Sequence, residues 1–460
     1  MSSRSEPTAE HAEIAEDQGI PESSASSAIS AVNQAAEYLP GGTYHTLSQN
    51  PDSAPEFLFS HGSGAYVYTT DGRRLLDIML GHGSLMLGHC PPSVVEAVKA
   101  QAERGNTFTH VTQPAIELAK MMVEVVPCAD KVRFINSGTE AVMLALRLVR
   151  AYTGKNKVLK FEGAYHGFAD ELLFSTNYGY PDRWPDYPAA DPDSLGIPAG
   201  RQDHVLIAPW NDLDLTAEIV RNNLDDLAGI ILEPVMRGLS SRPGFMEGMR
   251  ELATEHNVPL IFDEVGTGFK LALGGAQEYY GVTPDLATFG KGLGSGYPIG
   301  AVAGSEEIMS YLDPASPDDA RIFSLGSFHG NAVSTAAAVA TIKGLREPGT
   351  YEHLTSYGNR LRDGLEELFQ RFDLPVQMTG EANTVEWFFT TEPVTDYRSS
   401  LATNRGLKDR LAAQMRRHNV FGGGGRLGSS TAHGDTELSL TLEAMEASLV
   451  SLRDSGGLSG

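Results

Sequence analysis

The chain has 460 residues, 41% of them hydrophobic and 20% charged, which is enough to bury a large core in two or three domains. Its formal net charge of −24 argues against nucleic acid or an anionic membrane surface as a partner. No apolar run reaches membrane-spanning length, and the first residues lack the basic start and apolar core of a signal peptide. With only two cysteines, Cys90 and Cys128, we expect a cytoplasmic protein without a disulfide framework.

The N-terminal part of the chain changes character twice. Residues 1–28 are rich in Ser, Ala and Glu and predict a disordered or loosely packed arm. An Ala-rich helix follows near residue 30, and then two apolar runs, 65–68 and 75–80, flank the turn Thr70-Asp71-Gly72-Arg73. This pattern is typical of a β-hairpin.

From residue 91 to about 310, short apolar runs alternate with helical patterns. The expected strands are 131–135, 157–161, 205–207, 229–232 and 260–262, and the expected helices include 112–126, 138–152 and one before the last of these strands. Such alternation indicates a largely parallel sheet covered by helices on both faces. The stretch 170–203, rich in Pro, Asp and Tyr, is interpreted as a long insertion outside the core. Helices at 350–370, 405–418 and 441–453, with a strand at 384–390, predict a smaller α+β domain.

One lysine and one aspartate follow apolar runs in this alternating part. The run that ends at Phe289 is followed by Gly290-Lys291-Gly292, and a second run is followed by Asp263. A lysine and a carboxylate at strand ends suit pyridoxal phosphate chemistry, because the amine forms a Schiff base and the acid keeps the pyridine nitrogen protonated. Taken alone, Lys291 would be interpreted as a surface lysine.

Three further strand ends carry polar groups. Ser137, Gly138 and Thr139 stand between a strand and a helix, where they can cradle an anion or simply cap the helix with Glu140 as partner. Tyr165 and His166 follow the strand 157–161, and Glu233 follows another. An aromatic ring there can stack on a planar ligand, although a packed turn tyrosine is an equal interpretation. Because ligands bind at the carboxyl ends of such strands, we expect these positions to converge.

Other chemistries find little support in the sequence. The histidines are scattered, and no Cys cluster or His-Glu-x-x-His pattern indicates a metal site, so no metal ligand is predicted. Gly294-Ser295-Gly296 lies in a glycine loop rather than at the sharp turn of a serine hydrolase.

In combination, four motifs resemble the class III aminotransferases of the fold-type I pyridoxal phosphate enzymes, in the branch of glutamate-1-semialdehyde aminomutase. The motifs are Asn136-Ser137-Gly138-Thr139-Glu140-Ala141, Phe161-Glu162-Gly163-Ala164-Tyr165-His166-Gly167, Ile261-Phe262-Asp263-Glu264-Val265-Gly266-Thr267-Gly268-Phe269 and Gly326-Ser327-Phe328-His329-Gly330-Asn331. The resemblance implies a mostly parallel seven-stranded sheet in a large domain, 91–334. It also implies a small α+β domain built from 29–90 and 335–460.

The resemblance also assigns roles to single residues. Lys291 is then the Schiff-base lysine and Asp263 the partner of the pyridinium, while Ser137, Gly138 and Thr139 hold the phosphate. Tyr165 and Val265 would cover the two ring faces, and Glu233 and His166 would belong to the polar network around the cofactor. Ser327 stands where the family usually has a Thr that reaches the phosphate of the neighbouring subunit, which implies a homodimer with its active site at the interface.

Departures from the aminomutase pattern concern the substrate. The segment 41–48 lacks the Arg that binds the substrate carboxylate in those enzymes, and the loop usually rich in aromatics reads Gly81-His82-Gly83-Ser84. Arg426, after the glycine run 422–425, matches an Arg that binds carboxylates in some relatives, but it can equally be a loop arginine in a surface ion pair. Together with His82 and Tyr44, it forms the set of candidate substrate-binding residues.

These departures favour an aminotransferase that moves an amino group from a β-amino or aryl amino acid, or an amine, to a keto acid. The alternatives are a glutamate-1-semialdehyde-type 2,1-aminomutase, a racemase or decarboxylase on the same fold, and a non-enzymatic cofactor-binding module. Turnover of one substrate without an added keto acid would indicate the aminomutase.

Overall fold

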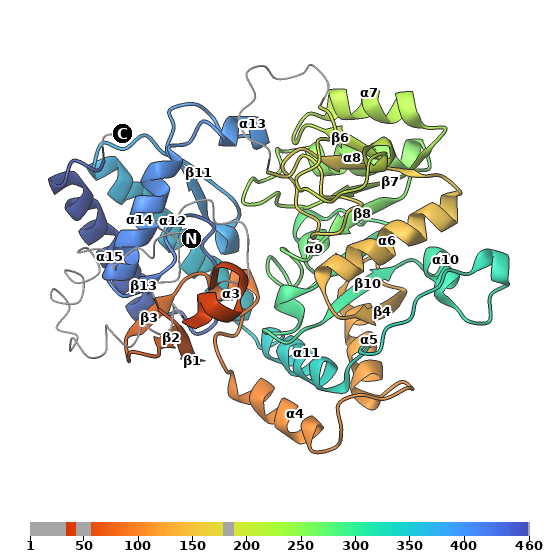
Figure 1. The fold of residues 1–460 in the computed structure, drawn as a ribbon, viewed down its shortest axis with the longest axis horizontal. Coiled ribbons are helices and arrows are strands. Elements are labelled where there is room, and N and C mark those ends of the chain that lie inside the picture. Colours follow the sequence, from red (N-terminus) through yellow and green to blue (C-terminus); the bar gives the residue numbers. More distant parts are fainter. Residues whose placement is uncertain (1–33, 43–56, 178–187, 459–460) are drawn as a thin grey trace.

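The computed structural model describes residues 34–42, 57–177 and 188–458, and its centre is a seven-stranded sheet of order β4-β10-β9-β8-β7-β5-β6 (Figure 1). The five strands from β9 to β6 run parallel, whereas β10 is antiparallel to both of its neighbours. The strands are β4 (Lys131–Ile135), β5 (Lys157–Phe161), β6 (Val205–Ala208), β7 (Leu227–Leu232), β8 (Leu260–Asp263), β9 (Leu286–Phe289) and β10 (Gly300–Gly304). The mostly parallel α/β architecture expected from the sequence is confirmed.

Helices cover both faces of this sheet. Residues of β7, β8 and β9 are buried throughout, which explains why these strands read as continuous apolar runs. On one face lie α6 (Gly138–Thr153) and α10 (Glu306–Met309). The other face is covered by α5 (Gln113–Val125), α7 (Leu213–Asn223), α8 (Phe245–Glu255) and α11 (Ala332–Leu345), while α4 (Pro92–Ala102) packs against α11.

A second group of elements combines both ends of the chain (Figure 1). In its four-stranded sheet, the C-terminal strand β13 pairs in parallel with β3 from the N-terminal hairpin. The group contains β1 (Phe59–Ser63), β2 (Tyr66–Thr69), β3 (Arg74–Asp77), α12 (Thr350–Arg371), β11 (Gln377–Thr379), β12 (Glu386–Phe388), α14 (Arg405–Arg417), β13 (Val420–Phe421) and α15 (Asp435–Asp454). Its core is a separate apolar cluster that includes Trp387 and Phe369. The remaining short helices are η1 (Pro40–Gly42), α3 (Leu80–Gly83), η3 (Arg201–His204), α9 (Ala276–Tyr280), η4 (Lys291–Leu293), η5 (Ser310–Leu312), η6 (Asp318–Ala320), η7 (Ala382–Thr384) and α13 (Tyr397–Ser400).

Two expectations about single segments are wrong. The stretch 170–203 is not wholly outside the core, because Leu172 and Phe174 are buried against the face of the sheet that α6 covers. The last helix begins at Asp435 rather than at 441, since the side chain of Glu437 accepts a hydrogen bond from the backbone of Gly434 and closes the first turn earlier. The predicted N-terminal arm lies outside the described residues.

Candidate active site

Lys291 follows β9 directly and opens the short helix η4. Its φ of 36° is left-handed, an unusual conformation for a residue with a side chain and one that often occurs at functional sites. The side chain is accessible to solvent, yet its amine is surrounded by protein atoms, and this burial lowers the pKa of Lys291. The charges of Glu233 and Asp263 act in the opposite direction, in favour of the ammonium form.

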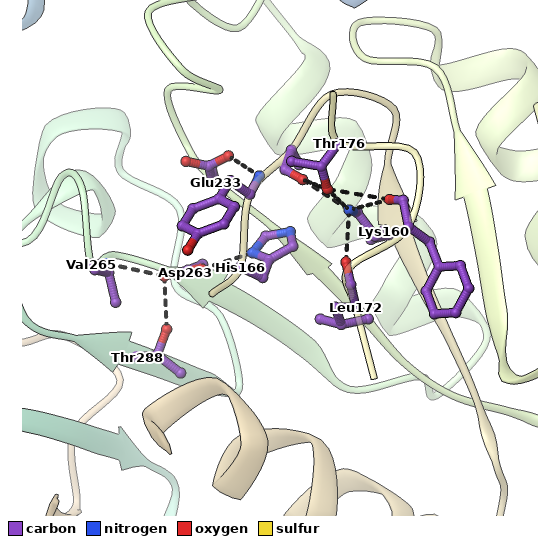
Figure 2. A network of polar contacts seen from close by, with 11 residues as sticks. Lys160, His166, Leu172, Thr176, Glu233, Asp263, Val265 and Thr288 are labelled. Carbon is purple, nitrogen blue, oxygen red and sulfur yellow. Dashed lines mark hydrogen bonds and ion pairs between the residues drawn. The ribbon is translucent and has the colours of Figure 1, made fainter. Parts of the chain in front are cut away.

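Asp263 ends the adjacent strand β8 and is only 3% exposed. Its Oδ1 accepts hydrogen bonds from the backbone N–H of Val265 (3.1 Å) and from Thr288 Oγ1 (3.0 Å). Its Oδ2 lies 2.7 Å from Nδ1 of His166 (Figure 2). Residues from β8, from β9 and from the loop after β5 therefore meet at one buried carboxylate, as the placement at strand ends predicts.

The loop after β5 supplies His166 and Tyr165. Nε2 of His166 is buried and has no partner within the described part of the chain, so this ring has an unused polar atom beside Asp263. The backbone N–H of Tyr165 donates to Glu233 Oε2 at 2.9 Å, while the Tyr165 side chain is 40% exposed. Burial raises the pKa of Glu233, an effect that the neighbouring His166 opposes. Glu233 thus fixes the backbone that carries the tyrosine.

The first turn of α6 lies at the same edge. Ser137 Oγ accepts from the N–H of Glu140 at 3.2 Å, so the helix-cap interpretation of this motif is correct. Capping does not exclude anion binding, because the N–H groups of Gly138 and Thr139 belong to the first turn, where helices offer no internal acceptor. A Cβ atom on Gly138 would lie 2.8 Å from both Cγ atoms of Val265. The absence of a side chain at Gly138 therefore lets Val265 approach the start of α6.

The candidate substrate residues lie on other elements. His82, in α3, is exposed and has a left-handed φ of 58°, and α3 contacts η4. Arg426 also has a left-handed backbone, and its Nε lies 3.9 Å from Glu386 Oε2 with 55% of the side chain exposed. Ser327 is exposed in a loop. Tyr44 and most of the arginine-free segment 41–48 lie outside the described residues.

Four residues near the site were not recognised from the sequence: Thr288, Arg237, Lys160 and Lys270. Thr288 and Lys160 are polar residues within apolar strand runs, a signal that was available but not used. Lys160 is fully buried, and four oxygen atoms of the segment 164–176 lie within hydrogen-bond distance of its Nζ (Figure 2). Arg237 approaches the site only through a turn with a left-handed φ of 52°, which no sequence pattern indicated. Its Nη1 donates to Asn177 Oδ1 at 2.7 Å.

The residues present fit pyridoxal phosphate. The start of α6 at Gly138 is approached by Val265, whose N–H binds the buried Asp263 carboxylate, and by Gly290, which precedes Lys291. The His166 ring beside the carboxylate keeps one nitrogen without a protein partner. No group of three or more His, Cys, Asp or Glu side chains in the described ranges is arranged to hold a metal ion. Fold and site together define the class of protein: an α/β enzyme of fold type I that uses pyridoxal phosphate.

Comparisons with known proteins identify the family. Residues 47–404 match the family described as "Aminotransferase class-III", and the chain belongs to that family. A protein named glutamate-1-semialdehyde 2,1-aminomutase from Natranaerobius thermophilus is 39% identical over 375 residues, which are 80% of this chain and 85% of that protein. An ω-transaminase from Sphaerobacter thermophilus superposes with a TM-score of 0.87 at 34% identity, covering 93% of this chain and 98% of the other. A β-phenylalanine aminotransferase from Variovorax paradoxus superposes with a TM-score of 0.82 at 25% identity, covering 96% and 97%.

Proposed function

We propose that this chain catalyses amino-group transfer with pyridoxal phosphate, with Lys291 as its catalytic base and Asp263 as the partner of the cofactor ring. The observation that carries this proposal is the position of Lys291 at the end of β9, next to the β8 strand end where Asp263 is held by His166, Thr288 and Val265. When bound, the cofactor supplies an electron-withdrawing ring that makes a substrate C–H bond acidic.

The chain's own groups then have separate tasks. A lowered pKa leaves a larger fraction of the Lys291 amine neutral near pH 7 than in an ordinary lysine, so Nζ can take a proton from the substrate carbon and return it. Asp263 supplies a fixed negative charge toward the ring nitrogen. First-turn N–H groups of α6 would hold the phosphate, and Tyr165 and Val265 would cover the two faces of the ring.

Two finer functions fit this chemistry. The names of the relatives support the 2,1-aminomutase, which was the alternative predicted from the sequence motifs. We therefore place the aminomutase first. Transfer between two molecules, from a β-amino or aryl amino acid to a keto acid, is supported by the ω-transaminase likeness and by the missing Arg in 41–48.

A homodimer is the second part of the proposal. Phe323, Leu325 and Phe328 are exposed by 76%, 79% and 59%, although all three are large apolar side chains. Val111 is 78% exposed in a neighbouring segment, which a hydrogen bond from Ala332 N to Asn106 O (3.1 Å) ties to the same region. Large exposed apolar side chains mark protein interfaces, and Leu325 and Phe328 flank Ser327 in the sequence.

The location of the protein is also proposed rather than observed. Both cysteines are free thiols, Cys90 exposed and Cys128 buried, which supports the proposed cytoplasmic location. None of the helices in the described ranges is long and apolar enough to cross a membrane.

The decisive experiment measures turnover of the purified, cofactor-loaded protein with and without a keto acid. Isomerisation of glutamate-1-semialdehyde without an added acceptor supports the aminomutase. Turnover of β-amino or aryl amino acids only with pyruvate or 2-oxoglutarate supports the aminotransferase. Asp263→Asn should reduce kcat in either assay about 100-fold or more, since it removes the charge that faces the ring. A wild-type protein that neither binds the cofactor nor turns over any of these substrates would disprove the proposal.

A further inference from the structure

Lys270 is a second buried lysine close to Lys291, and only 8% of it is exposed. Its backbone is held from both sides, because its N–H donates to Thr267 O at 3.0 Å and its carbonyl accepts from Asn383 Nδ2 at 2.8 Å. Its Nζ makes no hydrogen bond or ion pair with any residue that the structure describes. A fixed backbone therefore presents an amine without a partner.

Two glycines leave space around this amine. Nζ of Lys270 lies 2.7 Å from the position that a Cβ atom would take on Gly83, and 3.8 Å from the corresponding position on Gly428. Gly83 ends α3, which contacts η4, the short helix that begins at Lys291. Gly428 is two residues from Arg426. The amine thus lies between the turn that follows the N-terminal hairpin and the turn that carries Arg426.

Among the described residues, the charged groups that act on Lys270 are Lys291 and Arg426, both of its own sign. Burial, together with the smaller effects of Lys291 and Arg426, lowers the pKa of Lys270 to about 8. A buried ammonium is stable only with a counter-charge or several acceptors. The proposed site of the cofactor phosphate is the first turn of α6. The anion that pairs with the Lys270 ammonium should therefore belong to another molecule.

We propose that Lys270 Nζ is a further residue that binds the carboxylate of the substrate, beside Arg426, to which the family resemblance assigns that role. The substrates are then amino acids and keto acids rather than simple amines. This inference rests on the proposed function and deepens it, because it names the group of the substrate that the pocket recognises.

The test uses an unreactive carboxylate on the cofactor-loaded protein. Butanoate is titrated by calorimetry, with butanamide as the uncharged probe. The wild type should bind butanoate and not butanamide. Lys270→Met should weaken butanoate binding about 10- to 100-fold, the usual cost of losing one partner of a charged hydrogen bond. Lys270→Arg should keep the affinity within a few-fold. Lys343→Met serves as the control, since Lys343 pairs with Glu117 on an exposed helix face.

Two outcomes would overturn the inference. One is a butanoate affinity of Lys270→Met equal to that of the Lys343→Met control. The other is a loss of pyridoxal phosphate affinity in the Lys270→Met apoprotein, which would assign the amine to the cofactor phosphate. The proposed function fails separately: a wild type without any amino-transfer activity, whose butanoate binding still depends on Lys270, would refute the reaction and leave the carboxylate site standing.

Discussion

Lys160 and Lys270 are both buried lysines near the candidate active site, but they differ in whether the chain supplies oxygen acceptors for the amine. Lys160, on β5, is 0% exposed, and its Nζ lies within hydrogen-bond distance of Ala164 O (2.8 Å), Leu172 O (3.1 Å), Phe174 O (2.6 Å) and Thr176 Oγ1 (2.9 Å). Lys270, after β8, has cations as its charged neighbours and no acceptor within the described residues.

The difference separates two halves of the site. Around Lys160, the chain itself supplies every acceptor and thereby fixes the loop that carries Tyr165 and His166. The contacts that fix this loop, in the cofactor half of the site, therefore all come from one chain. Around Lys270, the left-handed turns of 81–83 and Arg426 leave an amine that only a bound anion can complete. In the substrate half, the Lys270 amine is thus paired only when a ligand is bound. This is expected for a residue that is kept for binding at a cost in stability.

Loss of Lys291, which lies between the two halves, should have the largest effect. Lys291→Ala removes the proposed base, and we expect kcat to fall about 1,000-fold or more, since general base catalysis contributes up to about 10⁴-fold. Steady-state kinetics with the best substrate measures the effect, and Lys343→Ala is the control. A variant that keeps a tenth of the wild-type kcat would show that another group moves the proton.

Lys160→Met tests the cofactor half, in which the chain itself supplies the oxygen acceptors of the buried lysine. The substitution leaves Leu172 O without a donor, and Ala164 O and Phe174 O keep only the Thr176 hydroxyl, so we expect the free energy of unfolding to fall by about 1–3 kcal/mol. Urea unfolding at pH 7 measures this loss. Lys157→Met on the same strand is the matched control, because Lys157 has only one side-chain bond, to Asn223 Oδ1 at 3.2 Å. Equal losses in the two variants would contradict the comparison.

Lys270→Met should have the opposite effect on stability. Burial lowers the pKa of Lys270 to about 8 and that of Lys160 to about 7, from the ordinary 10.5, so both charged lysines carry a burial cost near pH 7. The opposite sign is expected because only Lys160 has oxygen acceptors that its substitution would leave behind. Removing it should raise the free energy of unfolding there by about 2–3 kcal/mol.

The stability difference between Lys270→Met and the wild type should depend on pH, in a direction that follows from the lowered pKa of Lys270. Between pH 8 and 10.5 the unfolded wild type binds more protons than the folded form, so wild-type stability gains with rising pH and the advantage of the variant shrinks. Unfolding midpoints of both proteins at pH 7 and pH 10 measure the change. An advantage that stays constant with pH would show that Lys270 is not a destabilising buried cation.

Arg426→Met should have the smallest effect. Its side chain is 55% exposed, so solvent screens its charge, and we expect KM for a carboxylate substrate to rise about 10-fold with kcat changed less than about threefold. Initial rates over a range of substrate concentrations separate the two constants. A fall in kcat at unchanged KM would place Arg426 in catalysis rather than in substrate binding.

The agreement between sequence and structure differs between these two halves for a physical reason. Residues such as Asp263 and Lys291 follow apolar strands, and a parallel sheet brings its strand ends to one edge whatever the loops do. Sequence alone could therefore predict that they meet. Lys270 and Arg237 reach the site through turns whose path depends on contacts distant in the chain, including Asn383 Nδ2 on the Lys270 carbonyl.

Segment boundaries show the same limit. Phe174 lies in a stretch rich in turn-forming residues, yet it is buried. Its carbonyl accepts a hydrogen bond from the buried Lys160 amine, a contact between separate segments. The start of α15 at Asp435 depends on Glu437, whose side chain accepts a hydrogen bond from the backbone N–H of Gly434.

By itself, the sequence determined the α/β class, the family resemblance and the proposed roles of Lys291 and Asp263, because strand periodicity and local motifs are short-range properties. Only the tertiary structure decided which buried lysine is satisfied and which is not. That distinction depends on oxygen atoms and charges brought together from segments far apart in the chain, as with Lys270, Gly83 and Gly428.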